Sequence, residues 1–133
     1  DKNICMMIKT ILLVGLGGGV GSILRYLTSM LVTTYFHTVF PLATFVVNVL
    51  GCLAVGLITG FLESRQILNF DLKVLLITGF CGGYTTFSTF SAENINLFRS
   101  GHSLAAFIYL SASILIGLSA VWLGLALTKA SQQ

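Results

Sequence analysis

Four long apolar segments, separated by short breaks, constrain this sequence more than any other feature. They run from about 8 to 33, 43 to 62, 74 to 97 and 104 to 127. A helix needs about 20 predominantly apolar residues to cross the roughly 30 Å hydrocarbon core of a bilayer, and each segment meets that length. We therefore predict an all-α membrane protein with four transmembrane helices, in which residues 1–133 form a single domain.

The composition supports a chain that lies almost entirely within a membrane. Hydrophobic residues make up 56% of the sequence and charged residues 8%, whereas soluble domains carry about 25% charged residues. The basic residues are scattered, so we predict no nucleic-acid partner. His37 and His102 have no neighbouring nucleophile and carboxylate arranged for catalysis, so we do not expect an enzyme. The odd number of cysteines, without C-x-x-C spacing, indicates neither a disulfide framework nor a zinc site.

The third segment contains a run that disfavours a continuous helix. Gly79, Gly82 and Gly83 precede a stretch of threonines, serines and phenylalanines, and glycine and β-branched residues have poor helix propensity. The alternative is a continuous helix that packs closely through its glycines. Lipid supplies no hydrogen-bond partners, so free backbone groups at this depth must lie beside protein or a cavity. We predict a broken third helix, and the ends of such helices often bind ions.

Glycine pairs four residues apart predict close helix packing. The pairs are Gly15/Gly19, Gly17/Gly21 and Gly56/Gly60, where the missing side chains let two helices approach. Side chains fill the interior of a four-helix bundle, so one chain encloses little space. A transporting chain of this size therefore needs a partner, and a homodimer is the simplest closed form.

Uncharged hydrogen-bond donors lie inside the apolar segments. Thr44 and Asn48 share one face of the second predicted helix, and Tyr109 and Ser113 share one face of the fourth. Hydroxyls in membrane helices often bond only to a carbonyl one turn earlier, so each hydroxyl has a structural alternative to a functional role. The Asn48 amide is costly in hydrocarbon unless another helix or a solute satisfies it.

Phe87 and Phe90 flank Ser88 and Thr89 directly after the predicted break. Residues three apart lie on nearly the same helical face, and such an aromatic pair usually faces lipid or fills a core. However, an aromatic ring has a positive edge that can receive a small anion. A lining of hydroxyls, an amide and ring edges suits a dehydrated anion.

Two charged residues lie well inside the segments. Arg25 is near the end of the first, where its side chain either snorkels to the headgroups or forms an electropositive vestibule that concentrates anions. Glu93 follows Phe90 by three residues and must pair, protonate or face water. It either caps a pathway or bonds to a neighbouring helix.

These features resemble those of the Fluc (CrcB) family of small fluoride channels. The resemblance runs from about Gly18 to Ser113 and is carried by GGVG at 18–21, LRY at 24–26, TFVVN at 44–48 and, above all, GFCGGYTTFSTFSAE at 79–93. It implies a multi-pass protein of a bacterial inner membrane that exports fluoride passively. It also implies an antiparallel, dual-topology homodimer with two fluoride pathways, and a structural sodium ion held by the backbone carbonyls of Gly82 and Thr85 from both subunits.

The resemblance also implies roles for the polar and aromatic residues. Phe87 and Phe90 would form an aromatic box, and Asn48 would donate a hydrogen bond to fluoride. Arg25 would lie near the aqueous entrance and Glu93 near the polar track. The hydroxyls of that track would be those of Ser88, Thr89, Thr44, Tyr109 and Ser113. The chain departs from the family pattern outside these ligands, at Ala43, Tyr84 and Gly117.

The distribution of basic residues bears on the predicted dual topology. With both termini cytoplasmic, five basic residues fall inside and two outside: Lys2, Lys9, Arg65, Lys73 and Lys129 against Arg25 and Arg99. Such an excess favours one orientation, whereas an antiparallel dimer needs both.

Two competing hypotheses remain at this point. A small proton-coupled exporter of cationic drugs is also a short four-helix chain that forms antiparallel dimers, but it needs a membrane-embedded carboxylate in its first helix. Only Glu93, after the break, is available here. A membrane scaffold without transport activity would leave Asn48 and the polar run without a role.

Overall fold

The computed structural model describes residues 1–131, and the regular structure within them is helical throughout. The helices are α1 (Lys2–Tyr35), α2 (Leu42–Ser64), α3 (Phe70–Lys73), the π-helix η1 (Val74–Cys81), α4 (Gly82–Tyr84), α5 (Phe87–Arg99) and α6 (Ser103–Ala130). Three of them, α1, α2 and α6, are each long and apolar enough to cross a membrane, which indicates an all-helical membrane protein. They include the predicted segments 8–33, 43–62 and 104–127.

The third predicted segment is divided, as the glycine and threonine run indicated. Helices α3, η1 and α4 follow one another without a gap up to Tyr84, and α5 begins at Phe87. Between them, Thr85 and Thr86 are extended, with ψ angles of 158° and 113°. The Thr86 hydroxyl accepts a hydrogen bond from the Thr89 amide at 3.3 Å and so caps α5. Threonine is a favoured residue at this position because its side chain satisfies an otherwise free amide.

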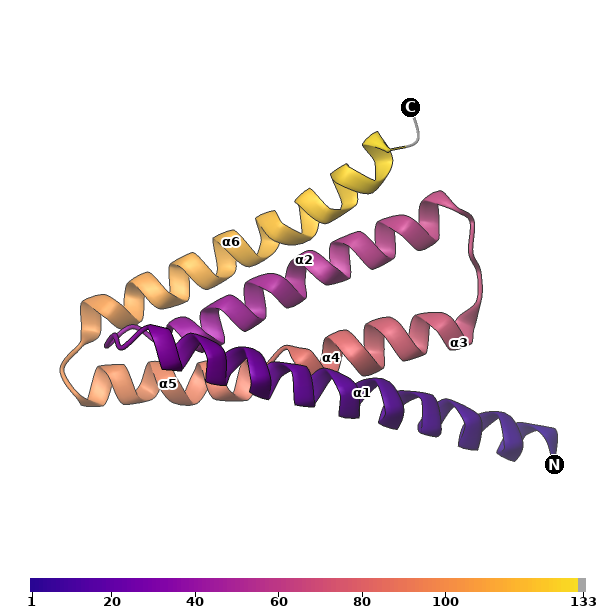
Figure 1. Cartoon of the computed structure of the whole chain (residues 1–133), viewed down its shortest axis with the longest axis horizontal. Coiled ribbons are helices and arrows are strands. Elements are labelled where there is room, and N and C mark those ends of the chain that lie inside the picture. The colour runs from indigo at the N-terminus through magenta and orange to yellow at the C-terminus, as the bar shows by residue number, and fades with distance from the viewer. Residues whose placement is uncertain (132–133) are drawn as a thin grey trace.

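The helices associate in two pairs, which Figure 1 shows: α2 lies along α6, and α1 packs across η1 and α4. Glycines bring the backbones together in both pairs. A Cβ added at Gly21 would come within 2.9 Å of the Tyr84 nitrogen, and one at Gly124 within 2.6 Å of the Leu57 nitrogen. Helix α5 packs against α6, so the break lies between α1 on one side and the α2–α6 pair on the other.

The pair Gly15/Gly19 differs from the other predicted glycine pairs. Among the described residues, no atom lies within 4 Å of a Cβ added at either position. Gly17 and Gly21 face η1 and α4, and positions two residues away lie about 200° around the helix. Gly15/Gly19 therefore forms no packing surface within the single chain and stays a predicted surface for a second copy, whereas Gly17/Gly21 and Gly56/Gly60 pack within the chain.

The described chain places both of its ends on one side of the molecule. The start of α1 and the end of α6 lie at the same end of the molecule but on opposite edges of it, and α5 leads into α6 at the other end (Figure 1). An ion pair between Lys9 and Asp71 ties α1 to α3 near the first of these ends. A small buried cluster, made by Phe90, Leu97, Ala106 and Tyr109, fixes α5 against α6 near the second.

Candidate functional site

A groove of about 430 Å³ opens beside the helix break. Five of the predicted site residues line it, namely Asn48, Thr85, Phe87, Phe90 and Ser113. Thr86 and apolar side chains from α2 and α6 complete the wall, among them Cys52, Val55, Ile114 and Val121. The groove thus joins residues that are far apart in the sequence and that were expected to serve one pathway.

At one part of the groove, which we name the amide site, Asn48 pairs with the backbone of Thr86. Asn48 Nδ2 donates to the Thr86 carbonyl at 3.1 Å, and the Thr86 amide donates to Asn48 Oδ1 at 2.8 Å. The side chain therefore replaces the helical partners that the extended residue has lost. A side-chain amide carries two N–H donors, so one donor of Asn48 remains beyond this pair.

The two predicted aromatic residues lie next to the amide site but in different surroundings. Their ring centroids are 5.8 Å apart. Phe90 is 8% exposed and meets the Tyr109 ring edge to face at 4.9 Å, whereas Phe87 is 78% exposed. One ring is thus fixed by the core of the chain, and the other projects from it.

Beyond Phe90 lies a second polar cluster, the carboxylate site, formed by Thr44, Glu93 and Tyr109. Thr44 Oγ1 donates to Glu93 Oε1 at 2.5 Å, and Tyr109 Oη donates to Glu93 Oε2 at 3.2 Å. Thr44 and Tyr109 are buried, with 7% and 0% of their surface exposed. Helices α2, α5 and α6 therefore converge on one carboxylate, and two of the hydroxyls predicted to line a pathway, those of Thr44 and Tyr109, bond to it.

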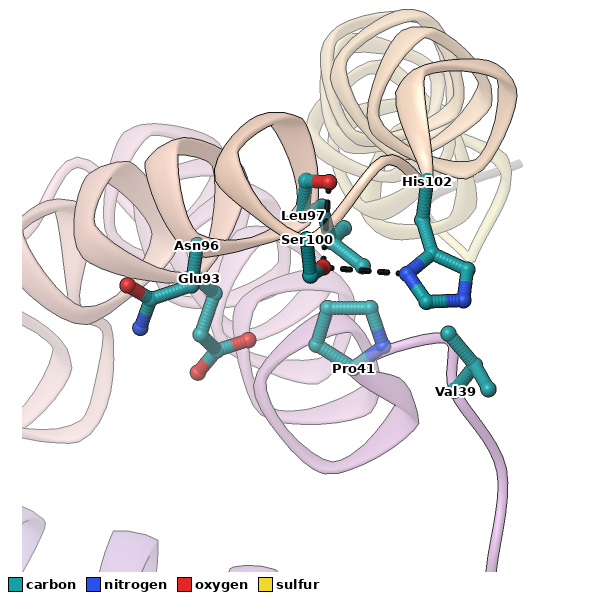
Figure 2. A pocket seen from close by; sticks show the side chains of 7 residues that line it. All are labelled: Val39, Pro41, Glu93, Asn96, Leu97, Ser100 and His102. Carbon is teal, nitrogen blue, oxygen red and sulfur yellow. Dashed lines mark hydrogen bonds between the residues drawn. The ribbon is translucent and has the colours of Figure 1, made fainter.

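Glu93 also borders two hollows at the end of the molecule. One, of about 330 Å³, is shown in Figure 2, where the carboxylate of Glu93 lies opposite Pro41. At the edge of the same hollow, a hydrogen bond of 3.0 Å joins His102 Nδ1 to Ser100 Oγ. The other, of about 200 Å³, lies between the end of α1 and the start of α2 and also includes Thr44. The carboxylate site is thus open to its surroundings by two routes.

The remaining hydroxyls divide into bonded and free groups. Thr86 Oγ1 contacts Thr89 Oγ1 at 3.1 Å and Ser88 Oγ at 3.3 Å, so both predicted residues belong to the cap of α5. Ser91 bonds back to the Phe87 carbonyl, which is the structural role common in membrane helices. By contrast, Ser113 Oγ is buried and has no hydrogen-bond partner among residues 1–131.

Arg25 contacts the helix break. Its Nη1 atom donates to the Thr85 carbonyl at 3.4 Å, and its side chain is half-buried. The guanidinium therefore lies behind the helix break, on the α1 side, and neither snorkels away from the protein nor lines the groove. This contact satisfies a carbonyl at the end of a helix, and the position of Arg25 near an aqueous entrance stays a prediction.

The carbonyls of Gly82 and Thr85 suit a hard cation in ligand type. In a continuous helix the Thr86 amide would donate to the Gly82 carbonyl, but here it donates to Asn48. Carbonyl oxygens are ligands that hard cations prefer. A sodium ion would share the Thr85 oxygen with Arg25, and two carbonyls from one chain supply only part of an ion's shell.

The model of the family described as "CrcB-like protein, Camphor Resistance (CrcB)" matches residues 12–125. The chain belongs to the CrcB family. The match covers α2, the divided third segment and most of α1 and α6, and therefore both the amide site and the carboxylate site.

Curated relatives of this CrcB protein match it over nearly its whole length. A protein of Flavobacterium psychrophilum is 54% identical over 121 residues, 91% of this chain and 98% of the relative. One of Azobacteroides pseudotrichonymphae is 46% identical over 92% of this chain and 98% of the relative. Both are named "Fluoride-specific ion channel FluC". The family is one of ion channels and not of enzymes, as the absence of a catalytic set in the sequence indicated.

Several polar contacts near the break of this CrcB protein were missed by reasoning from the sequence. Ser22 and Thr28 flank Arg25 at three-residue spacing on one face of α1 and contact the residues before the break. That spacing was a usable signal. Asn94, which is 4% exposed and donates to the Phe90 carbonyl at 2.8 Å, gave no such signal.

Proposed function

We propose that this chain forms a fluoride-selective channel that lets fluoride leave a bacterial cell passively, down its electrochemical gradient. One observation carries the proposal: neutral polar residues and two phenylalanines line a groove at the point where a divided helix frees its backbone. Membership in the CrcB family supports it, as do relatives named as fluoride-specific ion channels.

The amide site suits an anion that must lose its water. Fluoride holds its hydration shell tightly, so a pathway must replace water donor by donor. The second N–H of Asn48 and the unpartnered hydroxyl of Ser113 are neutral donors on the groove wall. Neutral donors in direct contact with an anion stabilise it without the tight trapping that direct contact with a cationic side chain would cause, so the ion can move on.

The aromatic residues supply the next contacts in this proposal. Phe90 is held by Tyr109, and Phe87 projects from the chain, so their rings can present positive edges from two directions. Beyond them the ion reaches the carboxylate site. There Glu93 occupies the donors of Thr44 and Tyr109, and fluoride passes by taking these hydroxyls in place of the carboxylate.

A second copy of the chain completes the pathway. The groove is open along one side and Phe87 is largely exposed, so a single chain does not enclose an ion. In the proposed assembly each chain crosses the bacterial inner membrane four times, with the two halves of the third segment forming one crossing. Two antiparallel copies then give two pathways. The excess of basic residues on one side favours one orientation, so the fraction of chains inserted in each orientation is the quantity to measure.

A structural sodium ion between the two copies fits this arrangement. The Gly82 and Thr85 carbonyls of both chains would hold it, and its charge would offset the carbonyl ends of the two divided helices. The proton-coupled exporter is not favoured, because the relatives are named as channels and Glu93 is already held by two hydroxyls.

The decisive experiment is fluoride efflux from liposomes that contain the purified protein, measured with a fluoride electrode. Chloride efflux from the same liposomes and fluoride efflux from protein-free liposomes are the controls. Fast fluoride efflux without chloride efflux supports the channel. If a folded dimer, identified by light scattering of the detergent complex, carries no fluoride, the proposal fails and proton-coupled cation transport becomes the assay to run.

A further inference from the structure

The face of α1 that meets the helix break carries three polar side chains at intervals of three residues. They are Ser22, Arg25 and Thr28, which we name the α1 polar ladder. Residues three apart lie on nearly the same side of a helix, and six residues rise about 9 Å along its axis. The ladder is therefore long enough to follow the chain as it leaves α4 and enters the break.

Two members of the ladder satisfy backbone carbonyls at the end of α4. Ser22 Oγ donates to the Gly83 carbonyl at 3.4 Å, and Arg25 Nη1 donates to the Thr85 carbonyl at 3.4 Å. The last carbonyls of a helix have no partner within it and form its negative end. A hydroxyl and a guanidinium are therefore placed where donors and positive charge are needed.

The third member meets a side chain that is unusual for the family pattern. Tyr84 is 9% exposed, and its Oη donates to Thr28 Oγ1 at 3.0 Å, while its ring stacks with Phe80 at 6.3 Å. Thr28 also bonds back to the Leu24 carbonyl, so it is fixed on α1. The tyrosine thus links the last turn before the break to the first helix.

The ladder and the groove lie on opposite sides of the same two residues. Thr85 accepts from Arg25 on the α1 side and also lines the groove, and Thr86 pairs with Asn48 on the groove side. We propose that the α1 polar ladder positions the break, and that Arg25 supplies fixed positive charge to the anion pathway from behind it. The second half of this proposal rests on the proposed fluoride conduction.

Arg25 variants test both halves with two independent measurements. Arg25→Gln keeps a hydrogen-bond donor and removes the charge, whereas Arg25→Lys keeps the charge and loses the planar guanidinium with its paired N–H groups. Arg99→Gln, on the exposed end of α5, is the matched control. We expect Arg25→Gln to lower fluoride efflux at least about tenfold and to speed hydrogen exchange over residues 83–89. Arg25→Lys should recover part of the efflux, and Arg99→Gln should match the wild type in both measurements.

The two measurements separate this proposal from the proposed function. If wild-type liposomes carry no fluoride, the charge half fails with the proposed function, and hydrogen exchange still decides the positioning half. Arg25→Gln with unchanged efflux and unchanged exchange overturns the whole proposal. If Arg25→Gln does not assemble, Tyr84→Phe and Thr28→Val replace it, since both remove the neutral hydrogen bond between Tyr84 and Thr28, and Thr28→Val also removes the bond to the Leu24 carbonyl. Faster exchange at 83–89 in both supports the ladder, and wild-type exchange overturns it.

Discussion

Thr44 and Asn48 lie one turn apart on the same face of α2, yet they meet different partners on the divided third segment. Asn48 bonds to the backbone of Thr86 and keeps a donor to spare, in a groove where Ser113 Oγ is unpartnered within the described chain. Thr44 bonds to Glu93, which also takes the hydroxyl of Tyr109. The amide site can therefore receive an anion without displacing anything, whereas the carboxylate site receives one only in exchange for a resident charge.

This difference assigns separate tasks to the two sites. The amide site, which binds without displacement, selects the ion and offsets the cost of its dehydration. The carboxylate site, which binds by exchange, prevents the ion from binding too tightly at the end of the pathway. A conducting site must bind strongly enough to admit an ion and weakly enough to release it. The predictions below test whether the tasks are divided in this way.

Asn48→Asp should have the largest effect, because it puts a negative charge at the amide site and replaces the N–H that donates to the Thr86 carbonyl with an acceptor oxygen. We expect fluoride efflux to fall at least about a hundredfold, which corresponds to a barrier increase of about 2.7 kcal/mol. Asn69→Asp is the matched control, since Asn69 caps α3 outside the site and aspartate caps equally well. Wild-type efflux from Asn48→Asp would show that the amide site lies off the pathway.

Phe90→Ile and Phe87→Ile should separate conduction from folding. Both remove a ring edge from the pathway, so we expect each to lower fluoride efflux about tenfold or more. Phe90 is buried against Tyr109 and Phe87 is exposed, so Phe90→Ile alone should lower the free energy of unfolding of the chain, by about 1–2 kcal/mol. Thermal unfolding in detergent measures this. Equal destabilisation by the two substitutions would contradict the placement of the rings.

Glu93→Gln should change how fluoride saturates the channel. Glutamine accepts at one oxygen only, so one hydroxyl of Thr44 or Tyr109 becomes free for the anion, and the repelling charge is removed. We expect half-saturation at a lower fluoride concentration, and a maximal efflux about tenfold lower because release is slowed. Glu63→Gln, at the exposed end of α2, is the control. An unchanged half-saturating concentration would argue against the exchange mechanism.

Hydropathy located α1, α2 and α6, each long and apolar enough to cross a membrane, because a helix needs about 20 apolar residues to span the hydrocarbon core. The break was predictable too, since glycines followed by β-branched residues disfavour a helix, and the extended pair Thr85 and Thr86 lies within that run. Thr86 as the cap of α5 agrees with a known preference. These are local effects, which neighbouring residues decide.

The partners of the polar side chains could not be predicted in the same way. Thr44 and Glu93 are 49 positions apart, and periodicity places Thr44 on a face of α2 without saying which helix lies opposite. The same limit applies to Arg25, whose contact with the Thr85 carbonyl, 60 positions along the chain, no local pattern indicated. Which helices pack together depends on glycine contacts such as that of Gly21 with Tyr84, and several glycine pairs in the sequence were equivalent candidates.

Ser113→Ala should have the smallest effect on efflux, and it should move stability and conduction in opposite directions. Ser113 Oγ is buried without a partner in the described part of the chain, and such a group costs about 1–3 kcal/mol. Alanine removes it, so we expect the chain to gain up to about 1 kcal/mol in the free energy of unfolding. Fluoride efflux should nevertheless fall about threefold, because the amide site loses one of its neutral donors. Ser111→Ala, two residues earlier on the exposed face of α6, should change neither quantity. A stabilised protein with undiminished efflux would show that Ser113 is only a packing residue, and the selecting task would then rest on Asn48 alone.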